Sequence, residues 1–168
     1  MDKIMRQLGS PKIDFEAFSN SICAGTERFR SHYYHCPPWV SNPSTQQERV
    51  YQQKRQAFFH SLDSLQRFQV RLGKLARRGA PPNYTYEQKR VDILLGVDLV
   101  RLSAKGIISK AHIVAGDSDF MPAIEFAQQD GVLVKIWPGP QGTYHQDIWR
   151  ACDELEELTL PLFQSFSI

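Results

Sequence analysis

The most constraining feature of the sequence is a strand, a helix and a second strand that follow one another closely in its C-terminal half. Residues 112–115 form a short apolar run that ends at Gly116, as a buried strand ends in a tight turn. A helix is predicted next, with Pro122 in its first turn and Gly131 after its end. Residues 132–137 are a second apolar run. Two strands joined in this way run parallel, so the pattern predicts an α/β fold.

The rest of the chain predicts further helices and strands. We expect a helix over residues 14–24, a strand over 28–35, a helix from its cap Ser44 to about Leu65, a strand over 68–72, a helix from Arg90 to Gly106 and a short helix over 148–152. Residues 76–86, which contain Gly79, Pro81 and Pro82, are expected to form a loop. The prediction is a three-layer α/β/α fold with a mainly parallel central sheet, in one domain over residues 1–168.

Two acids lie at the end of the strand over residues 112–115. Asp117 and Asp119 follow it directly, and ligands of open parallel sheets gather at the carboxyl ends of the strands. A lone Asp in such a turn is typically a helix cap. Two acids with one intervening Ser weaken that interpretation, because one cap is enough.

The predicted helix from Arg90 supplies two more carboxylates. Its apolar residues lie on almost every side of the helix axis, so we expect the helix to be largely buried. Asp98 shares a line with Leu94 and Leu102, where an unpaired carboxylate is costly. It either supports a metal site without binding the metal directly or pairs with a buried basic group. Asp92 is about 120° away around the helix axis and close to the helix start, which makes it the better candidate to join Asp117 and Asp119.

Three carboxylates without Cys or clustered His make an oxygen-rich site. Such a site suits a hard cation, Mg²⁺ or Mn²⁺, with Asp92, Asp117 and Asp119 as ligands and catalytic residues, and with Asp98 as a possible fourth ligand. A metal there activates water and neutralises charge that develops on a phosphodiester, which are the main demands of hydrolytic strand cleavage.

Composition and charge limit the other classes of function. The chain has 168 residues, of which 42% are hydrophobic, and its net charge of +2 does not support general binding to polyanions. It contains no apolar run of the about 18 residues that span a bilayer, and no signal peptide opens it. Three cysteines without a C-x-x-C pair indicate neither a disulfide framework nor a zinc site. We therefore expect a cytoplasmic protein that does not bind membranes.

One segment is nevertheless strongly basic. Between Arg67 and Arg90 there are seven basic residues and one acid, with Tyr84 and Tyr86 interleaved. We expect an RNA-binding surface that contacts phosphates and stacks on bases, formed by Arg71, Lys74, Arg77, Arg78, Lys89 and Arg90. A solvated strand edge and loop would give the same pattern. Because the segment directly precedes Asp92, a channel that leads to the acids is the sharper hypothesis.

Three motifs together carry a family resemblance. They are Lys-Arg-Val-Asp at residues 89–92, Val-Ala-Gly-Asp-Ser-Asp-Phe-Met-Pro-Ala at 114–123 and Gly-Val-Leu-Val at 131–134. In this order they resemble the NYN domain, a branch of the PIN-like metal-dependent ribonucleases, over about residues 12–158. The resemblance implies a Mg²⁺ or Mn²⁺ site in which Asp92, Asp117 and Asp119 take acidic positions of the family. It also implies single-stranded or structured RNA as the usual substrate class.

The chain departs from the family pattern at its start. Family members open with a central strand that ends in a metal-binding Asp, whereas residues 1–9 resemble the helix that follows that strand. Either a segment upstream of Met1 supplies the strand and its Asp, which we expect, or the domain lacks both the central strand and this ligand. In the second case we expect no efficient nuclease activity.

Three classes of function remain open. A metal-dependent ribonuclease is favoured, and a catalytically impaired PIN-like module that binds RNA or a protein partner is the alternative. A phosphatase of the haloacid-dehalogenase type shares a late Gly-Asp motif but needs an early Asp-x-Asp nucleophile, which is not found here. RNA is the expected partner, and a homodimer is left open.

Overall fold

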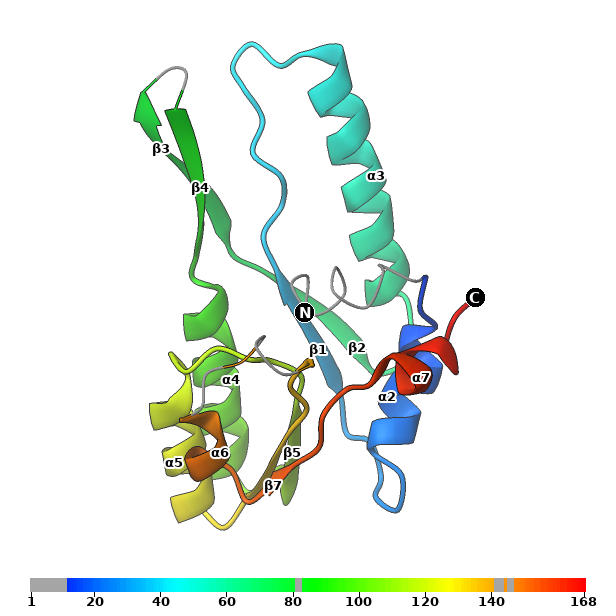
Figure 1. Ribbon diagram of the computed structural model, residues 1–168, viewed down its shortest axis with the longest axis vertical. Helices are drawn as coiled ribbons and strands as arrows, with labels where there is room; N and C mark the ends of the chain where they lie inside the picture. The colour runs from blue at the N-terminus through cyan, green and yellow to red at the C-terminus, as the bar shows by residue number, and fades with distance from the viewer. Residues whose placement is uncertain (1–11, 81–82, 141–143, 145–146) are drawn as a thin grey trace. The chain divides into compact units, whose positions relative to one another are not determined.

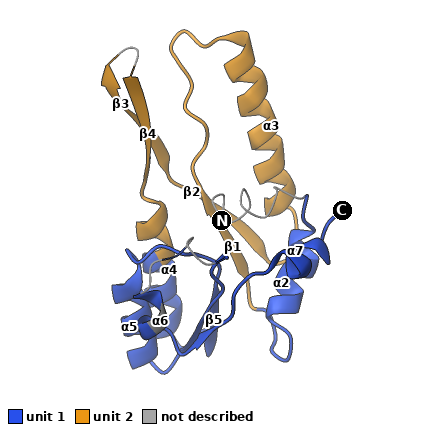
Figure 2. Ribbon diagram, viewed as in Figure 1, with its two compact units in different colours: residues 1–28, 96–168 blue, residues 29–95 orange. Residues whose placement is uncertain are grey.

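The computed structural model describes residues 12–80, 83–140, 144 and 147–168 (Figure 1). Its backbone forms two compact units. Unit 1 comprises Met1–Arg28 and Gly96–Ile168, and unit 2 comprises Phe29–Leu95 (Figure 2). The helix that the sequence predicts over residues 1–9 lies outside the described residues.

Unit 2 begins with a parallel strand pair joined by a long helix. Strand β1 (Ser31–His35) pairs with β2 (Phe68–Leu72), and helix α3 (Gln46–Asp63) connects them. The two strands and the helix are confirmed, but the cap of α3 is Thr45 and not Ser44. The Thr45 hydroxyl accepts a hydrogen bond from the backbone N–H of Glu48, and the Glu48 carboxylate accepts one from the backbone N–H of Thr45. This reciprocal capping box satisfies two N–H groups that the first turn leaves without partners.

Aromatic packing joins α3 to β1. The ring of Tyr33 on β1 lies 5.8 Å from the ring of Phe58 and 6.5 Å from that of Phe59, measured between centroids. The guanidinium of Arg55 covers both phenylalanine rings, at 5.1 Å and 5.0 Å. Tyr33, Phe59 and Leu62 are buried, so this contact is the core that holds α3 on the strand pair.

An antiparallel hairpin follows β2 after Gly73. Strand β3 (Lys74–Ala80) pairs with β4 (Asn83–Lys89), with Lys74 opposite Lys89 and Ala80 opposite Asn83. The loop predicted over residues 76–86 is therefore wrong. Gly79, Pro81 and Pro82 are typical of a loop, but the residues that flank the two prolines pair as antiparallel strands.

Unit 1 contains the predicted parallel strand–helix–strand unit. Strands β5 (Lys110–Ile113) and β6 (Leu133–Ile136) are parallel and joined by α5 (Met121–Gln129), and β7 (Glu154–Leu155) adds a third parallel strand beside β6. Helices α6 (Ile148–Ala151) and α7 (Leu160–Gln164) complete the C-terminal region. The side chains of Val134 and Ile136 on β6 are fully buried, as the apolar pattern of a parallel strand predicts.

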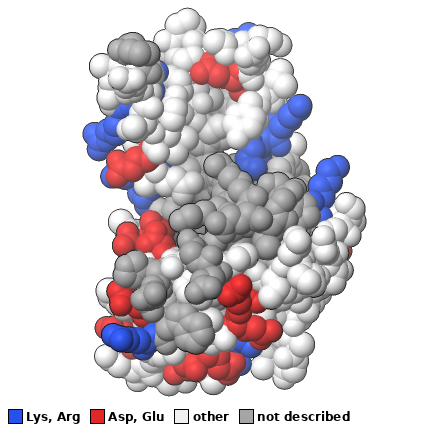
Figure 3. Space-filling model, in the orientation of Figure 1, with Lys and Arg blue, Asp and Glu red and all other residues white. Residues whose placement is uncertain are grey.

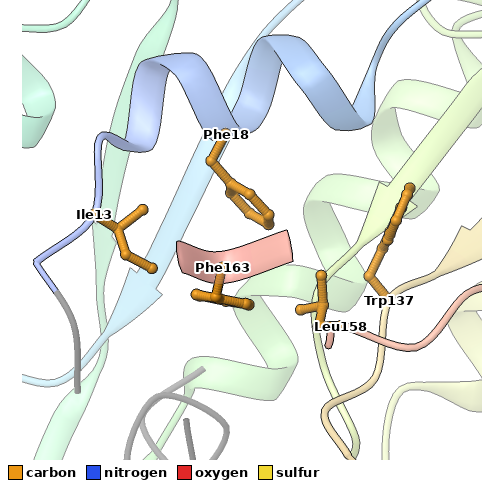
Figure 4. Packing of buried hydrophobic residues seen from close by; sticks show 5 residues of the cluster. All are labelled: Ile13, Phe18, Trp137, Leu158 and Phe163. Carbon is orange, nitrogen blue, oxygen red and sulfur yellow. The ribbon is translucent and has the colours of Figure 1, made fainter. Parts of the chain in front are cut away.

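A second apolar cluster of unit 1 joins the two ends of the described chain. Helix α2 (Phe15–Ile22), which Asp14 caps, contributes Phe18, and α7 contributes Phe163, with 5.5 Å between their ring centroids. Figure 4 shows these side chains turned toward one another together with Ile13, Leu158 and Trp137. Trp137, directly after β6, is buried.

Helix α4 (Val91–Ala104) differs from the expectation of a helix buried all round. Asp98, Leu99 and Ser103 are buried, whereas the side chains of Ile93 and Val97 are 68% and 56% exposed. Its high apolar content indicated burial on every side, but apolar residues also occur singly on protein surfaces. None of the helices in the described part of the chain is long and apolar enough to cross a bilayer.

The described residues thus form a mixed α/β structure. Their strands make three small sheets, of which β1–β2 and β5–β6–β7 are parallel and β3–β4 is antiparallel. The α/β class and its parallel strands are confirmed. One central sheet in three layers, and one domain over the whole chain, stay predictions.

Candidate active site

Asp117 and Asp119 lie on the loop between β5 and α5, at the carboxyl end of β5. Both are exposed, and the Asp117 Oδ1 atom accepts a hydrogen bond of 3.2 Å from the backbone N–H of Asp119. The N-cap of α5 is Phe120, whose side chain makes no capping hydrogen bond. The Asp117 carboxylate therefore closes an Asx turn with the backbone N–H two residues later, and it does not cap α5.

The loop is anchored by groups other than its carboxylates. The ring of Phe120 is buried, and the backbone carbonyl of Ser118 accepts a hydrogen bond from the backbone N–H of Met121. These contacts hold the backbone while Asp117 and Asp119 remain at the surface. Exposed carboxylate oxygens are the ligands that Mg²⁺ and Mn²⁺ prefer, so the chemistry of this donor pair fits a hard cation.

Helix α4 carries the other two predicted acids. Asp92 is exposed in the first turn, within unit 2, and Asp98 is 5% exposed, within unit 1. The difference in burial agrees with the angle of about 120° that six residues of helix put between two side chains. The prediction that Asp98 is buried is confirmed.

Only part of the predicted site is brought together. The structure places Asp117 and Asp119 on one loop of unit 1, whereas Asp92 belongs to unit 2. Among residues 12–80, 83–140, 144 and 147–168, no three His, Cys, Asp or Glu side chains are arranged to hold a metal ion. The site of three carboxylates therefore stays a prediction.

The residues predicted to bind RNA gather in and around the β3–β4 hairpin. Lys74, Arg77, Arg78 and Lys89 lie on the hairpin, Arg71 on β2, and Arg90 between β4 and α4. Four of the six are exposed, and Arg71 and Lys89 are half-buried. On the face drawn in Figure 3, basic side chains flank an acidic one over the hairpin at the upper left.

Glu87 partly neutralises one side of the hairpin. Its carboxylate pairs with the Lys89 ammonium and lies 3.6 Å from the Arg78 guanidinium. The hydrogen bond from Lys89 is the main cause that lowers the pKa of Glu87 below its usual range. Lys74 and Arg77 do not share this carboxylate in the described contacts, so the hairpin keeps a positive excess.

The opposite side of the hairpin carries an aromatic group that sequence reasoning did not assemble. The Arg77 Cζ atom lies 4.0 Å from the ring centroid of Trp39 and 4.2 Å from that of Tyr84. The rings of Trp39 and Tyr86 are 6.0 Å apart. The sequence does not reveal this group, because no local pattern links Trp39, in the loop after β1, to a hairpin far along the chain.

Cys36 is not a candidate ligand or nucleophile. It is buried, its Sγ atom lies 3.9 Å from the Lys89 carbonyl oxygen, and burial is the main cause that raises the pKa of its thiol. A buried neutral thiol that contacts a backbone carbonyl has a structural role.

The described residues form an α/β protein with parallel strands and a pair of exposed carboxylates after β5, at the end of a strand where open parallel sheets generally bind their ligands. The chain belongs to the NYN domain family, whose model matches residues 3–159. NYN domains are part of the PIN-like superfamily. The family predicted from the motifs is thus confirmed, and the match begins upstream of the expected residue 12. Searches of curated proteins and of solved structures gave no significant match.

Proposed function

We propose that the protein is a metal-dependent ribonuclease that hydrolyses RNA phosphodiester bonds. The observation that carries this proposal is the exposed pair Asp117 and Asp119 at the carboxyl end of β5, in a chain of the NYN family. PIN-like nucleases generally use divalent metals, and NYN domains generally bind RNA. We infer that Asp92 joins the pair at one edge of a three-layer central sheet.

Each group has a distinct task in this proposal. Asp92, Asp117 and Asp119 hold Mg²⁺ or Mn²⁺, with Asp98 as a supporting or structural group. When bound, the metal supplies an activated water and charge neutralisation at the scissile phosphate. The basic residues at the hairpin hold neighbouring phosphates of the RNA: Arg71, Lys74, Arg77, Arg78, Lys89 and Arg90.

The Asp117→Asn variant tests the site. Cleavage of end-labelled single-stranded RNA is measured with Mn²⁺ and with EDTA. We expect the wild-type protein to cleave only with the metal. Asp117→Asn should reduce the rate at least about 100-fold. The reason is that the loss of a ligand weakens the binding of the metal, which stabilises the transition state by several kcal/mol.

Asp130→Asn is the matched control, since Asp130 is an exposed acid of unit 1 at the other end of α5. Its cleavage rate should equal that of the wild type. Metal-dependent cleavage that survives Asp117→Asn unchanged would refute the assigned site.

One observation favours the alternative of a catalytically impaired module. The described residues contain no group of three metal-binding side chains. Such a module would bind RNA, would bind no Mn²⁺ in isothermal titration calorimetry, and would leave labelled RNA intact.

A further inference from the structure

The β3–β4 hairpin has two faces of different chemistry. Directly opposed residues of an antiparallel pair point to the same side, and successive residues alternate. Arg77 is opposite Tyr86, and Gly79 is opposite Tyr84, so the side chains of Arg77, Tyr84 and Tyr86 share one face. Lys74, Arg78, Glu87 and Lys89 project from the other face. We call the first the aromatic face and include Trp39, which packs on it.

The aromatic face is organised around one guanidinium. Arg77 is within 4.2 Å of the ring centroids of both Trp39 and Tyr84, so it links the loop after β1 to β4. Contact with two rings restricts the side chain while its charge is retained. Tyr86 lies beside Trp39, and its side chain is 53% exposed. A large ring is thus held at the surface by neighbours from the same unit.

The segment that carries this face is basic, and its charge is complementary to a phosphodiester backbone. From Lys74 to Arg90 the chain has five basic residues and one acid, and that acid, Glu87, is engaged with Arg78 and Lys89. Aromatic rings and basic groups carried by one element are the combination that binds single-stranded nucleic acid, because bases stack on the rings and cations hold the phosphates.

We propose that the aromatic face is a stacking platform for an unpaired RNA base, with Tyr86 as the exposed ring and Arg77 as the residue that positions Trp39 and Tyr84. The proposal rests on the proposed function only in taking RNA as the ligand. It makes the substrate class single-stranded, because a duplex keeps its base faces stacked inside. The platform needs none of the carboxylates and no metal.

Binding in EDTA tests the platform apart from any cleavage. The probe is a fluorescein-labelled single-stranded RNA of about twelve nucleotides, within the range of such sites, and affinity is read by fluorescence anisotropy. We expect Tyr86→Ala to weaken binding about tenfold and Tyr86→Phe to restore it. Tyr51→Ala is the matched control, because Tyr51 is 57% exposed on α3 of the same unit and should bind as the wild type does.

Two further measurements separate stacking from charge and from misfolding. Tyr86→Ala should leave the slope of log affinity against log salt concentration unchanged. Lys74→Ala should reduce that slope by about one, because Lys74 neutralises a phosphate and releases its counterion, whereas Tyr86 is uncharged. The wild type should bind the single strand at least about tenfold more tightly than a duplex of the same sequence. Trp39→Leu, a second variant on the platform, should also weaken binding of the single strand.

Equal affinity of Tyr86→Ala and the wild type, or equal affinity for single strand and duplex, would overturn the proposal. So would an acidic peptide that binds through Tyr86 while RNA does not. Because the platform needs no carboxylate and no metal, its RNA affinity in EDTA is measured apart from cleavage. A wild type that binds RNA through Tyr86 and never cleaves it would therefore refute the nuclease and leave the platform standing.

Discussion

Single residues show what a local pattern predicts well. Asp14 caps α2, and Asp98 is buried on α4, as their positions before and within apolar helical patterns indicate. Asp117 shows the limit, because the sequence left a helix cap and a metal ligand as alternatives. Its Asx turn depends on the backbone geometry after β5, which residue types do not specify.

His112 is a residue whose role becomes visible only in the structure. Its Nδ1 atom accepts a hydrogen bond of 3.0 Å from the Nε1–H of the buried Trp137, so the ring is neutral at Nδ1. Burial, and then the charges of Lys110 and Lys135, lower the pKa of His112 from 6.5. As the pH falls, the His112 imidazole is therefore protonated at a higher pH in the unfolded chain than in the folded chain. Protonation of His112 thus favours unfolding.

The expected result is a free energy of unfolding that decreases as the pH falls below about 6.5 toward the lowered pKa of the folded state. His112→Asn, which keeps an acceptor without a titrating ring, should remove this decrease. His112→Leu leaves the indole N–H of Trp137 without its acceptor and should cost about 1–3 kcal/mol at neutral pH. Urea denaturation from pH 5 to 8 measures both.

His60→Asn is the control, because His60 is an exposed residue in the last turn of α3. A wild type whose stability is the same at pH 5 and pH 8 would contradict the assignment to His112.

At the scale of elements, periodicity predicted most helices and strands. The segment β5–α5–β6 and the strand β2 are confirmed, the latter with the same bounds. The β3–β4 hairpin was missed because its strands carry Arg, Lys and Gln where the pattern of a half-buried strand requires apolar residues. Pairing between the two strands, which a single segment does not reveal, forms this element.

Gly73 joins β2 to the hairpin at a position with no room for a side chain. A Cβ atom there would lie 2.4 Å from the Lys89 carbonyl oxygen and 2.9 Å from Val91 Cγ2. Because the nearest atom belongs to the backbone, Gly73→Ala must displace the start of β3 or the end of β4. We expect a loss of about 1–3 kcal/mol in the free energy of unfolding, measured by urea denaturation.

Gly96→Ala is the matched control within α4. A Cβ atom there would be 3.4 Å from Ala123 Cβ, an ordinary contact, and Ala is favoured over Gly in a helix. Its stability should be equal to or above that of the wild type. Equal stability of the Gly73→Ala variant and the wild type would contradict the prediction, because it would show that the backbone at the junction accommodates the added methyl group.

At the scale of the whole molecule, the family match covers both units although unit 1 is discontinuous in sequence. Residues 3–159 span the first part of unit 1, all of unit 2 and most of the rest of unit 1. The sequence predicted that strands would be parallel, because connections determine direction. It could not establish whether the separate strand pairs merge into one sheet, since that depends on contacts between segments far apart in the chain.

The proposed metal site gives a prediction at this scale. If Asp92 of unit 2 and Asp117 of unit 1 bind the same ion, Mn²⁺ should slow amide hydrogen exchange both in the first turn of α4 and in the loop after β5. At 100 times the dissociation constant the ion should add about 2.7 kcal/mol to the free energy of unfolding. Mass spectrometry of exchange with and without Mn²⁺ measures the protection, and Asp117→Asn should abolish it in both segments. Protection confined to the loop would limit the site to unit 1.

The junction between β4 and α4 has a mechanical consequence. Arg90 alone separates the two elements; its left-handed backbone, with φ of 74°, redirects the chain, and its carbonyl accepts the bond of 2.9 Å from Leu94 that opens the helix. Tyr86 and Asp92 therefore lie on consecutive elements that a single residue separates. If an RNA base stacks on Tyr86 and Asp92 holds the metal, as we propose, cleavage should fall at a fixed number of nucleotides from the stacked base.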